Sequence, residues 1–505
     1  MLSSLDSTIV ATMLPTISRD FDGAASYSWV GNAYLLTSTA LAPIWGKVSD
    51  IFGRKRLLIF CVLEFMATSA LAAVSVNMPM LITARALQGI GGGGISGLTM
   101  AIIGEIISPR ERGKYQGILA STTGLGAVMG PLVGGLMTDK LNWRYGFWIN
   151  LPIGFLTILG YHFAISLPAP RGSLKTQLRR VDWLGIVLST ASIAVFLLGL
   201  TWGGTVYPWA SGQVLGLFAV AVVVGATFVW WELRAVEPVI PPVLFKERNY
   251  ALVNVVFFCL GFTIWSVSYF VPVYFQEVLF LSPTDSGVQN LPYMGFFIVF
   301  SMLCGYLVSW SGQLVIFPRI GLLIATVALG LLSMLRPDSS KFMQILPQAL
   351  VGAGLGWTNS PSTVYAQVNS PTNMIGPGTT VVQFTRALGS CVGIAAFTAV
   401  YSNVVSVQLP DKITGVATQY KLTPAQVELF EASYSSSDAN AGALDLSSIP
   451  SDALSSLRSV LSSSRADGLH YAFVAAVPFT VVGWATTLWL RHVPLRTTAV
   501  VKMQK

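Results

Sequence analysis

Long apolar segments recur along almost the whole chain and are separated by short polar stretches. A helix that crosses the hydrocarbon core of a bilayer needs about 20 apolar residues, and its backbone polar groups must pair within the segment. Fourteen segments approach this length, at roughly 2–17, 28–46, 57–76, 80–104, 116–137, 145–167, 183–201, 212–232, 251–275, 287–308, 319–335, 342–362, 378–401 and 471–490. The pattern predicts an all-α polytopic membrane protein with 14 transmembrane helices.

Lys and Arg are concentrated in alternate loops. Fifteen lie in the loops after the second, fourth, sixth, eighth and tenth spans, and five lie in the opposite short loops. Because cytoplasmic loops carry an excess of Lys and Arg, the richer set and both termini are predicted to be cytosolic. Topology therefore explains the net charge of +8, and no nucleic-acid partner is expected.

Composition agrees with a lipid environment. Only 10% of the residues are charged and 53% are hydrophobic, whereas soluble domains carry about 25% charged residues. The four cysteines lie in apolar runs and are read as small core residues. The sequence has no Cys/His cluster with metal-ligand spacing, and no hydrolase or nucleotide-binding motif. We therefore expect no enzyme, no metal and no cofactor.

Two segments break the regular pattern. The first span gives about 24 Å of helix against about 30 Å of hydrocarbon, so we expect its start and a cytosolic tail to precede the given sequence. Residues 402–470 are rich in Ser, Ala and Asp and are predicted to form an external loop, with short helices near TPAQVELFEA and PSDALSSLRSVL. This loop is interpreted as a flexible cap, and a part in substrate capture is the alternative.

The loop GKVSDIFGRKR contains the most specific motif in the chain. Its glycines permit tight packing and turning at helix ends, its aspartate can lock a charge near the next helix, and its basic residues hold the loop in the cytosol. The residues that we assign to a gating loop are Gly46, Asp50, Gly53, Arg54, Lys55 and Arg56. In this form and position the loop resembles the signature of the major facilitator superfamily.

Three further strings extend the resemblance. TARALQGIGGGG places Arg85 in an apolar span, and LDSTIVATMLP places Asp6 in the first span. GAVMGPLVGG resembles the antiporter motif of exporting facilitators, with simple helix packing as the alternative; its residues are Gly126, Gly130, Pro131, Gly134 and Gly135. Together with WRYGFWINLPIG, DWLG, EPVIPPVLF and SGVQNLP, these strings resemble the fourteen-span drug:proton antiporter (TCR/Tet) family. The forms SWVGNAYLL and SDIFGRK resemble its fungal type. Fungal vacuolar transporters of basic amino acids are also similar.

The resemblance implies an architecture of two six-helix bundles and two inserted helices. The expected parts are the first bundle over 1–167, a cytosolic linker with the inserted spans over 168–249, the second bundle over 250–490 and a cytosolic tail over 491–505. Substrate is expected near the bilayer midplane between the bundles. The resemblance further implies a monomer whose partners are lipid, protons and a small-molecule substrate.

Proton coupling needs a group that changes its charge inside the membrane. A buried arginine costs about 2.5–3.5 kcal/mol on insertion scales, so Arg85 needs water or an acidic partner, and we expect Asp6 to pair with it. Glu64 is the alternative proton carrier, or else an interhelical hydrogen-bonding group. Glu105 is read as a solvated helix end. The proton gradient replaces any nucleotide or cofactor.

Aromatic and amide side chains in the spans are the candidate substrate contacts. They are Trp29, Asn32, Tyr34, Gln88, Asn150, Trp265, Tyr269, Trp357, Asn359 and Gln383. Arg386 either pairs with a carboxylate or holds an anionic substrate. The resemblance implies a proton-coupled exporter of drugs, toxins or secondary metabolites at the plasma membrane. The alternatives are a vacuolar transporter of basic amino acids and a membrane sensor that does not transport.

Overall fold

The structure is a computed structural model that describes residues 2–21, 28–164, 178, 180–204, 206–435 and 448–494. Within these ranges regular structure is helical, apart from an isolated bridge between Gly203 and Tyr207. All 14 predicted spans overlap helices. In the same part of the chain, eight helices are long and apolar enough to cross a membrane. The prediction of an all-α polytopic membrane protein is confirmed.

The helices follow one another along the chain in three groups. The first group contains α1 (Leu2–Asp20), α2 (Ser28–Ala40), α3 (Ala42–Phe52), α4 (Arg54–Ala73), α5 (Met78–Ile106), α6 (Arg112–Lys140), α7 (Tyr145–Trp148) and α8 (Asn150–Ala164). The inserted pair is α10 (Trp183–Trp202) and α11 (Gly212–Glu232). The last group contains α12 (Val243–Lys246), α13 (Arg248–Val273), a π turn (Tyr274–Val278), α14 (Pro283–Gln289), α15 (Leu291–Ser311), α16 (Ile316–Leu332), α17 (Lys341–Val368), a 3₁₀ turn (Thr372–Met374), α18 (Ile375–Tyr420), α19 (Pro424–Ser435) and α20 (Ser451–Leu488).

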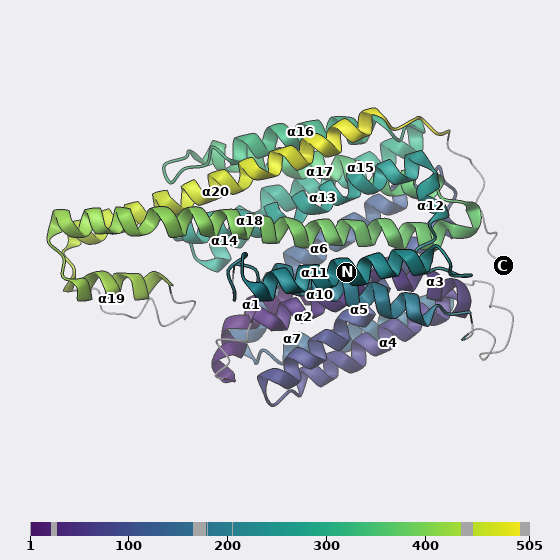
Figure 1. Cartoon of the computed structure of the whole chain (residues 1–505), viewed down its shortest axis with the longest axis horizontal. Helices are drawn as coiled ribbons and strands as arrows, with labels where there is room; N and C mark the ends of the chain where they lie inside the picture. The colour runs from purple at the N-terminus through teal and green to yellow at the C-terminus, as the bar shows by residue number, and fades with distance from the viewer. Residues whose placement is uncertain are drawn as a thin grey trace.

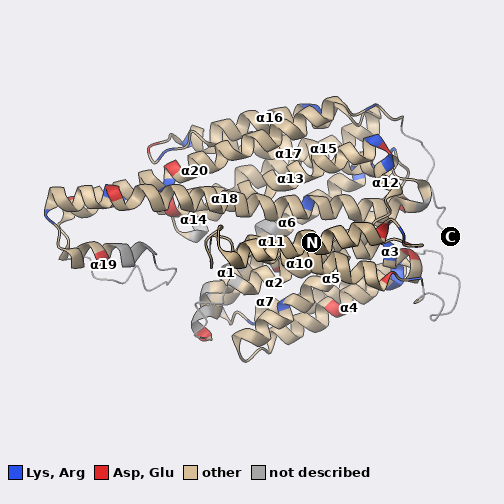
Figure 2. Ribbon diagram, in the orientation of Figure 1, with Lys and Arg blue, Asp and Glu red and all other residues tan. Residues whose placement is uncertain are grey.

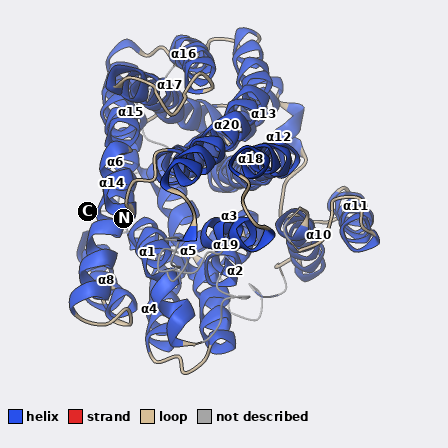
Figure 3. Cartoon of the chain, turned by 90° about the vertical axis from the view of Figure 1, so that its left-hand side faces the viewer, coloured by secondary structure: helices blue, strands red, loops and turns tan. Residues whose placement is uncertain are grey.

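The first and last groups form two halves, and the inserted pair lies to one side (Figure 3). The halves meet where α6 packs on α15 and where α18 packs on α3 and α5. Glycines allow the closest approach: a Cβ on Gly113 of α6 would lie 2.6 Å from the carbonyl oxygen of Gly305 on α15. The proposed domain boundaries stay predictions; linker residues 168–177 and tail residues 495–505 lie outside the described part of the chain.

Local signals explain where several helices begin and end. The side chains of Asn77, Asp182, Ser211 and Ser340 accept hydrogen bonds from backbone N–H groups in the first turns of α5, α10, α11 and α17, as N-cap residues do. Gly53, between α3 and α4, has a φ of 93°, a conformation that favours glycine. The gating loop therefore requires this glycine for its sharp turn.

The described residues within 402–470 are helical, in contrast to the predicted flexible loop. The short helices predicted near TPAQVELFEA and PSDALSSLRSVL are confirmed as α19 and the start of α20. Helix α18 has 46 residues and α20 has 38, so α18 alone is about 69 Å long at 1.5 Å per residue. Both helices run past the rest of the bundle, and α19 lies at their tip (Figure 1). The apolar residues that face inward recur at helical spacing. The Ser-rich residues between them made this stripe hard to recognise in the sequence. We call the part of α18, α19 and α20 within residues 402–470 the extension.

The extension has its own small core and is tied to the bundle by charge. The core residues are Ile413, Val416, Phe430, Ile449, Ala453, Leu457 and Leu461. At its base Asp467 pairs with Arg336, which precedes α17, and with Lys412 at 3.3 Å. Tyr401 donates a hydrogen bond of 2.5 Å to Glu277 of the π turn. The extension is therefore a packed helical element.

The core of the extension predicts a local destabilisation. Leu457→Ala removes a fully buried side chain and should cost about 2–5 kcal/mol of local stability. Limited proteolysis and hydrogen exchange should show faster opening over the extension while the bundle stays protected. The matched control is Val407→Ala on α18, whose side chain is 65% exposed. Equal behaviour of the two variants would contradict a packed core.

Candidate functional site

Four helices, α1, α4, α5 and α8, bring polar side chains to one buried point in the first half. The Arg85 guanidinium donates to Asp6 Oδ2 at 2.6 Å, and Asp6 Oδ1 accepts from Gln88 Nε2 at 3.0 Å and from Asn150 Nδ2 at 2.7 Å. Ser69 Oγ of α4 accepts from Gln88 at 2.6 Å and from Asn150 at 3.2 Å. These five side chains are at most 1% exposed. The structure thus joins the predicted residues Asp6, Arg85, Gln88 and Asn150. Together with Ser69 we call them the Asp6 network.

Tyr34 of α2 closes the network on another side. The Arg85 guanidinium carbon lies 4.5 Å from the centre of the Tyr34 ring, a cation–π arrangement. Tyr34 and Ser3 share a hydrogen bond of 2.6 Å, and Arg85 Nε donates to the carbonyl of Val30 at 3.2 Å. Gly89 makes this approach possible, because a Cβ there would overlap the backbone of Tyr34.

The buried charges of Asp6 and Arg85 are paired with each other and hydrogen-bonded to polar neighbours. A buried ion pair is stable only when its remaining donors and acceptors are also used. The Asp6 carboxylate accepts three hydrogen bonds, and Arg85 also donates to Gln88 Oε1 at 2.5 Å. Because Gln88 lies three residues after Arg85, both side chains share one face of α5. Ser69 was not predicted, since a single hydroxyl in an apolar helix is a weak signal.

Glu64 lies elsewhere in the first half. It is half-buried on α4, and a Cβ on Gly91 of α5 would overlap its carboxylate. Among the described residues, no hydrogen bond or ion pair joins Glu64 to Asp6 or Arg85. Its place at the α4–α5 seam suits an interhelical role, and its role as a proton carrier stays a prediction.

The gating loop forms a second charged cluster, at an end of the bundle where charged residues gather (Figure 2). Arg54 pairs with Asp50 at 2.6 Å and with Glu105 of α5 at 2.5 Å. A Cβ on Gly376, at the start of α18, would lie 2.6 Å from the Arg54 guanidinium carbon. Glu105 is therefore ion-paired, and the expectation of a merely solvated helix end was wrong. Arg54 links the loop, α5 and the second half.

Other contacts hold the two halves together at this end. Gly46 lies against α18, where a Cβ would come within 2.9 Å of the Pro377 Cα. Gln367 of α17 donates to the carbonyl of Met100 on α5 at 3.2 Å. Lys55 donates to the carbonyl of His162 at 2.9 Å, whereas Arg56 is exposed. The halves are thus closed at the end that carries the gating loop.

The glycines of GAVMGPLVGG place α6 against α1. Thr8 Oγ donates to the carbonyl of Gly126 at 3.3 Å, and a Cβ on Gly130 would lie 2.5 Å from the Thr8 Cβ and 3.0 Å from the Ile9 nitrogen. Gly134 is buried. The surroundings of Pro131 and Gly135 lie outside the described residues. The described contacts show close helix packing, and the antiporter role stays a prediction.

The predicted substrate residues of the second half fall into two places. Arg386 of α18 donates to Asn359 Oδ1 of α17 at 3.3 Å, and Gln383 lies one turn before Arg386. The Gln383 amide is buried with no described hydrogen-bond partner. Trp357 instead packs between Phe300 and Phe317, with ring centres 5.4 and 5.9 Å away. The structure therefore groups Arg386, Asn359 and Gln383 and separates Trp357 from them.

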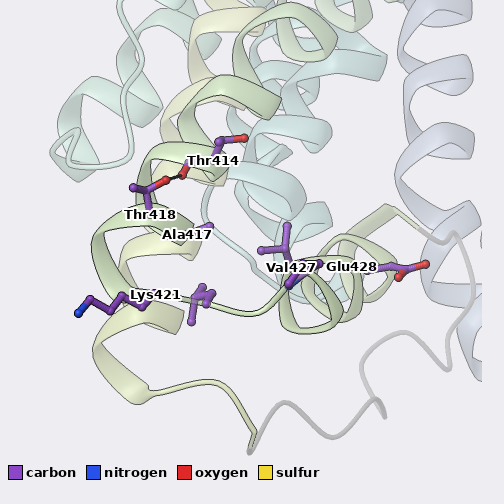
Figure 4. Close-up of a pocket in the computed structure, with 8 residues that line it drawn as sticks. Thr414, Ala417, Thr418, Lys421, Val427 and Glu428 are labelled. Atoms are coloured by element: carbon purple, nitrogen blue, oxygen red, sulfur yellow. Dashed lines mark hydrogen bonds between the residues drawn. The ribbon is translucent and has the colours of Figure 1, made fainter.

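The remaining candidates are not joined to either group by a described contact. Trp29 and Asn32 are half-buried on α2, and Trp265 and Tyr269 are exposed on α13. A surface hollow of about 650 Å³ lies far from all of them, between α18 and α19 (Figure 4). It is lined by Thr414, Ala417, Thr418, Lys421, Leu422, Pro424, Val427 and Glu428. This hollow belongs to the extension.

A carboxylate near the gating loop, Glu237 in the string EPVIPPVLF, was not among the predicted site residues. Glu237 pairs with Lys47 at 2.9 Å and with Arg180 at 2.7 Å. The hydrogen bonds from Arg180 lower the pKa of Glu237 below its usual value, so the carboxylate is charged at neutral pH. No spacing in the sequence relates residues 47, 180 and 237, and only the folded chain reveals this contact.

Comparison with known proteins gives consistent matches. A sequence model described as Major Facilitator Superfamily matches residues 1–394. The multidrug transporter protein MdtP of Bacillus subtilis is 34% identical over 504 residues, covering 98% of this chain and 91% of that protein. The efflux pump dotC of Dothistroma septosporum is 34% identical over 499 residues, covering 98% and 82%. The solved structure of the human organic anion transporter MFSD10 (TETRAN) has a TM-score of 0.59 at 14% identity, with 95% and 97% coverage.

The contact between α1 and α6 predicts an effect of Gly130→Ala. The added methyl group would overlap Thr8, and overpacking of this kind costs about 1–3 kcal/mol. Thermal unfolding of the detergent-purified protein should show a lower midpoint. In the control, Gly160→Ala on α8 adds a methyl group with no atom within 4 Å. A midpoint for Gly130→Ala that equals the control would show that the contact is unimportant.

Proposed function

The chain belongs to the major facilitator superfamily, and we propose that it is a proton-coupled secondary transporter that exports small organic molecules by alternating access. It is a multi-pass membrane transporter rather than an enzyme. Export is supported by relatives named as a multidrug transporter and an efflux pump. The observation that carries proton coupling is the Asp6 network, which holds a carboxylate and an arginine fully buried.

The Asp6 network can act as a two-state element. In the structure Asp6 only accepts hydrogen bonds, which is the pattern of an ionised carboxylate. A proton on Asp6 would be a hydrogen-bond donor facing three other donors, those of Arg85, Gln88 and Asn150. It would also remove the negative charge that pairs with Arg85. The network would then have to rearrange. Because Asp6 is 0% exposed, proton exchange requires a second conformation, and this requirement couples protonation to the conformational change.

The proton gradient supplies enough free energy for export. One elementary charge that moves through 100 mV releases about 2.3 kcal/mol, and one pH unit adds about 1.4 kcal/mol. One proton per cycle would therefore support a gradient of several hundredfold for an uncharged solute. Export to the outside requires the plasma membrane, and a single chain contains both halves, so we propose a monomer in that membrane.

Arg386 favours substrates that carry a negative charge. Its one described side-chain hydrogen bond goes to the neutral Asn359, and no described carboxylate forms an ion pair with it. The neighbouring Gln383 amide also has unused donors and acceptors. A substrate carboxylate, sulfonate or phosphate would satisfy both residues. A basic amino acid would meet repulsion at Arg386, and Asp6 is already engaged by Arg85.

Removal of the Asp6 carboxylate should uncouple transport. In proteoliposomes with an imposed acid gradient, Asp6→Asn should abolish accumulation of substrate against its gradient, while downhill movement continues. The control is Asp452→Asn, at an exposed carboxylate in the first turn of α20. Gradient-driven accumulation by Asp6→Asn at the level of the control would contradict a coupling role for Asp6.

The substrate class is tested by Arg386→Gln. With size-matched organic probes of charge −1, 0 and +1, transport of the anion should fall roughly tenfold, as expected for loss of a charge-assisted hydrogen bond. Transport of the neutral probe should change much less. Arg248→Gln, at an exposed arginine at the start of α13, is the control. Equal losses for all three probes would show that Arg386 has a structural role instead.

A further inference from the structure

The inserted pair α10–α11 meets the gating loop through three charged residues. Glu237 lies in the connection from α11 to α12, Arg180 precedes α10, and Lys47 is the second residue of the gating-loop motif. Glu237 Oε2 lies 2.9 Å from Lys47 Nζ, and Glu237 accepts from Arg180 at 2.7 and 3.2 Å. The Glu237 carboxylate therefore links α3 with both connections that flank the inserted pair, the one before α10 and the one after α11. We call this contact the Glu237 clamp.

The connection that carries Glu237 is held in a defined shape. The Glu232 carboxylate, at the end of α11, is 5% exposed and accepts from the backbone nitrogens of Val239 at 3.1 Å and Ile240 at 3.3 Å. Trp231 Nε1 donates to the Asp182 carboxylate at 2.9 Å, which joins the end of α11 to the start of α10. Asp182 is also the N-cap of α10. Glu237 is thus presented by a packed loop.

The inserted pair also touches both halves of the transporter. Helix α10 contacts α2 of the first half and α18 of the second half, and it lies between α11 and the bundle (Figure 3). The same α18 begins against Arg54 and Gly46 of the gating loop. When the halves separate at this end, α10 cannot keep its contacts with both α2 and α18 unless it moves.

We propose that the Glu237 clamp fastens the inserted pair to the gating loop, so that α10 acts as a strap that stabilises the closed arrangement of the two halves at this end. Glu237 and Lys47 are positioning residues: neither has a described contact with Arg386 or with Asp6. The clamp holds α10 on the first half, and the packing of α10 on α18 then resists separation. Loss of the clamp should favour opening without changing the Asp6 network.

The expected effect on opening depends on how far the Lys47 and Glu237 side chains are exposed to water. Lys47 and Glu237 side chains are 20% and 25% exposed, and ion pairs in partial contact with water contribute modestly. Because Glu237 pairs with two cations, it remains ion-paired when one of them moves away. Breaking the clamp should raise the ratio of open to closed molecules about threefold, in the range expected for such pairs.

The test measures opening directly. Spin labels on Phe163→Cys at the end of α8 and on Ile316→Cys at the start of α16 report the separation of the halves by double electron–electron resonance. Both positions are exposed, and the protein without these two substitutions measures background labelling of its native cysteines. Glu237→Gln should increase the ratio of the longer-distance to the shorter-distance population about threefold. Glu247→Gln, at an exposed glutamate ten residues further on, is the matched control and should leave the distribution unchanged.

A second variant removes the clamp from its other side. Lys47→Met should produce the same shift as Glu237→Gln, and the double variant should shift no further than the larger single effect. A distance distribution of Glu237→Gln that equals that of Glu247→Gln overturns the proposal. Independent, additive shifts of the two single variants also overturn it, because they would show that the residues do not act as a pair. Neither measurement depends on the substrate or on proton coupling.

Discussion

The placement of Arg85 inside a lipid-embedded bundle constrains the whole first half. A cation in such a position costs several kcal/mol unless it is paired and hydrogen-bonded. The structure meets this requirement with Asp6 from α1, the Tyr34 ring and the Val30 carbonyl from α2, and Gln88 from α5 itself. Ser69 and Asn150 from α4 and α8 complete the set. The network therefore connects all five helices, so the group proposed to sense protons also contributes to their packing.

Helix α5 connects this network to the gate. Arg85 and Gln88 lie in its first half, and Glu105, at its other end, pairs with Arg54. About 20 residues, or about 30 Å of helix, separate the two. We expect a shift of α5 at the network to reach the ion pair at the gate, because the glycines of α5 pack closely against α2 and α4 along its middle. Gln367 of the second half also bonds to the carbonyl of Met100 on α5. The same helix therefore touches both the proposed proton site and the closed interface between the halves.

Sequence reasoning succeeded where a single physical rule decides the outcome. Spans were predicted because apolar segments of sufficient length must be helical in lipid, and the pairing of Asp6 with Arg85 was predicted because buried charges need partners. For residues 402–470 it succeeded in part: the short helices around Phe430 and Leu457 were predicted. The polar composition was nevertheless read as a flexible loop, and the continuation of α18 to Tyr420 and the shared core were missed. Sequence reasoning could not separate Trp357 from Asn359, because the face that each side chain presents depends on neighbouring helices. The Glu237 clamp could not be predicted either, since its three residues lie far apart in the sequence.

Among the described residues, the inserted pair contributes no side chain to the Asp6 network and makes no hydrogen bond to Arg386. In the most apolar stretches of α10 and α11 only 22% and 11% of the residues are buried, although α10 contacts α2 and α18. Lipid tails are as apolar as these side chains and provide no hydrophobic drive for docking. Specific attachment must then come from the helix ends, where Asp182, Glu232 and Glu237 make directional bonds outside the hydrocarbon. Charge at the ends fixes the pair to the gating loop, and the contacts of α10 with α2 and α18 let this attachment act on both halves.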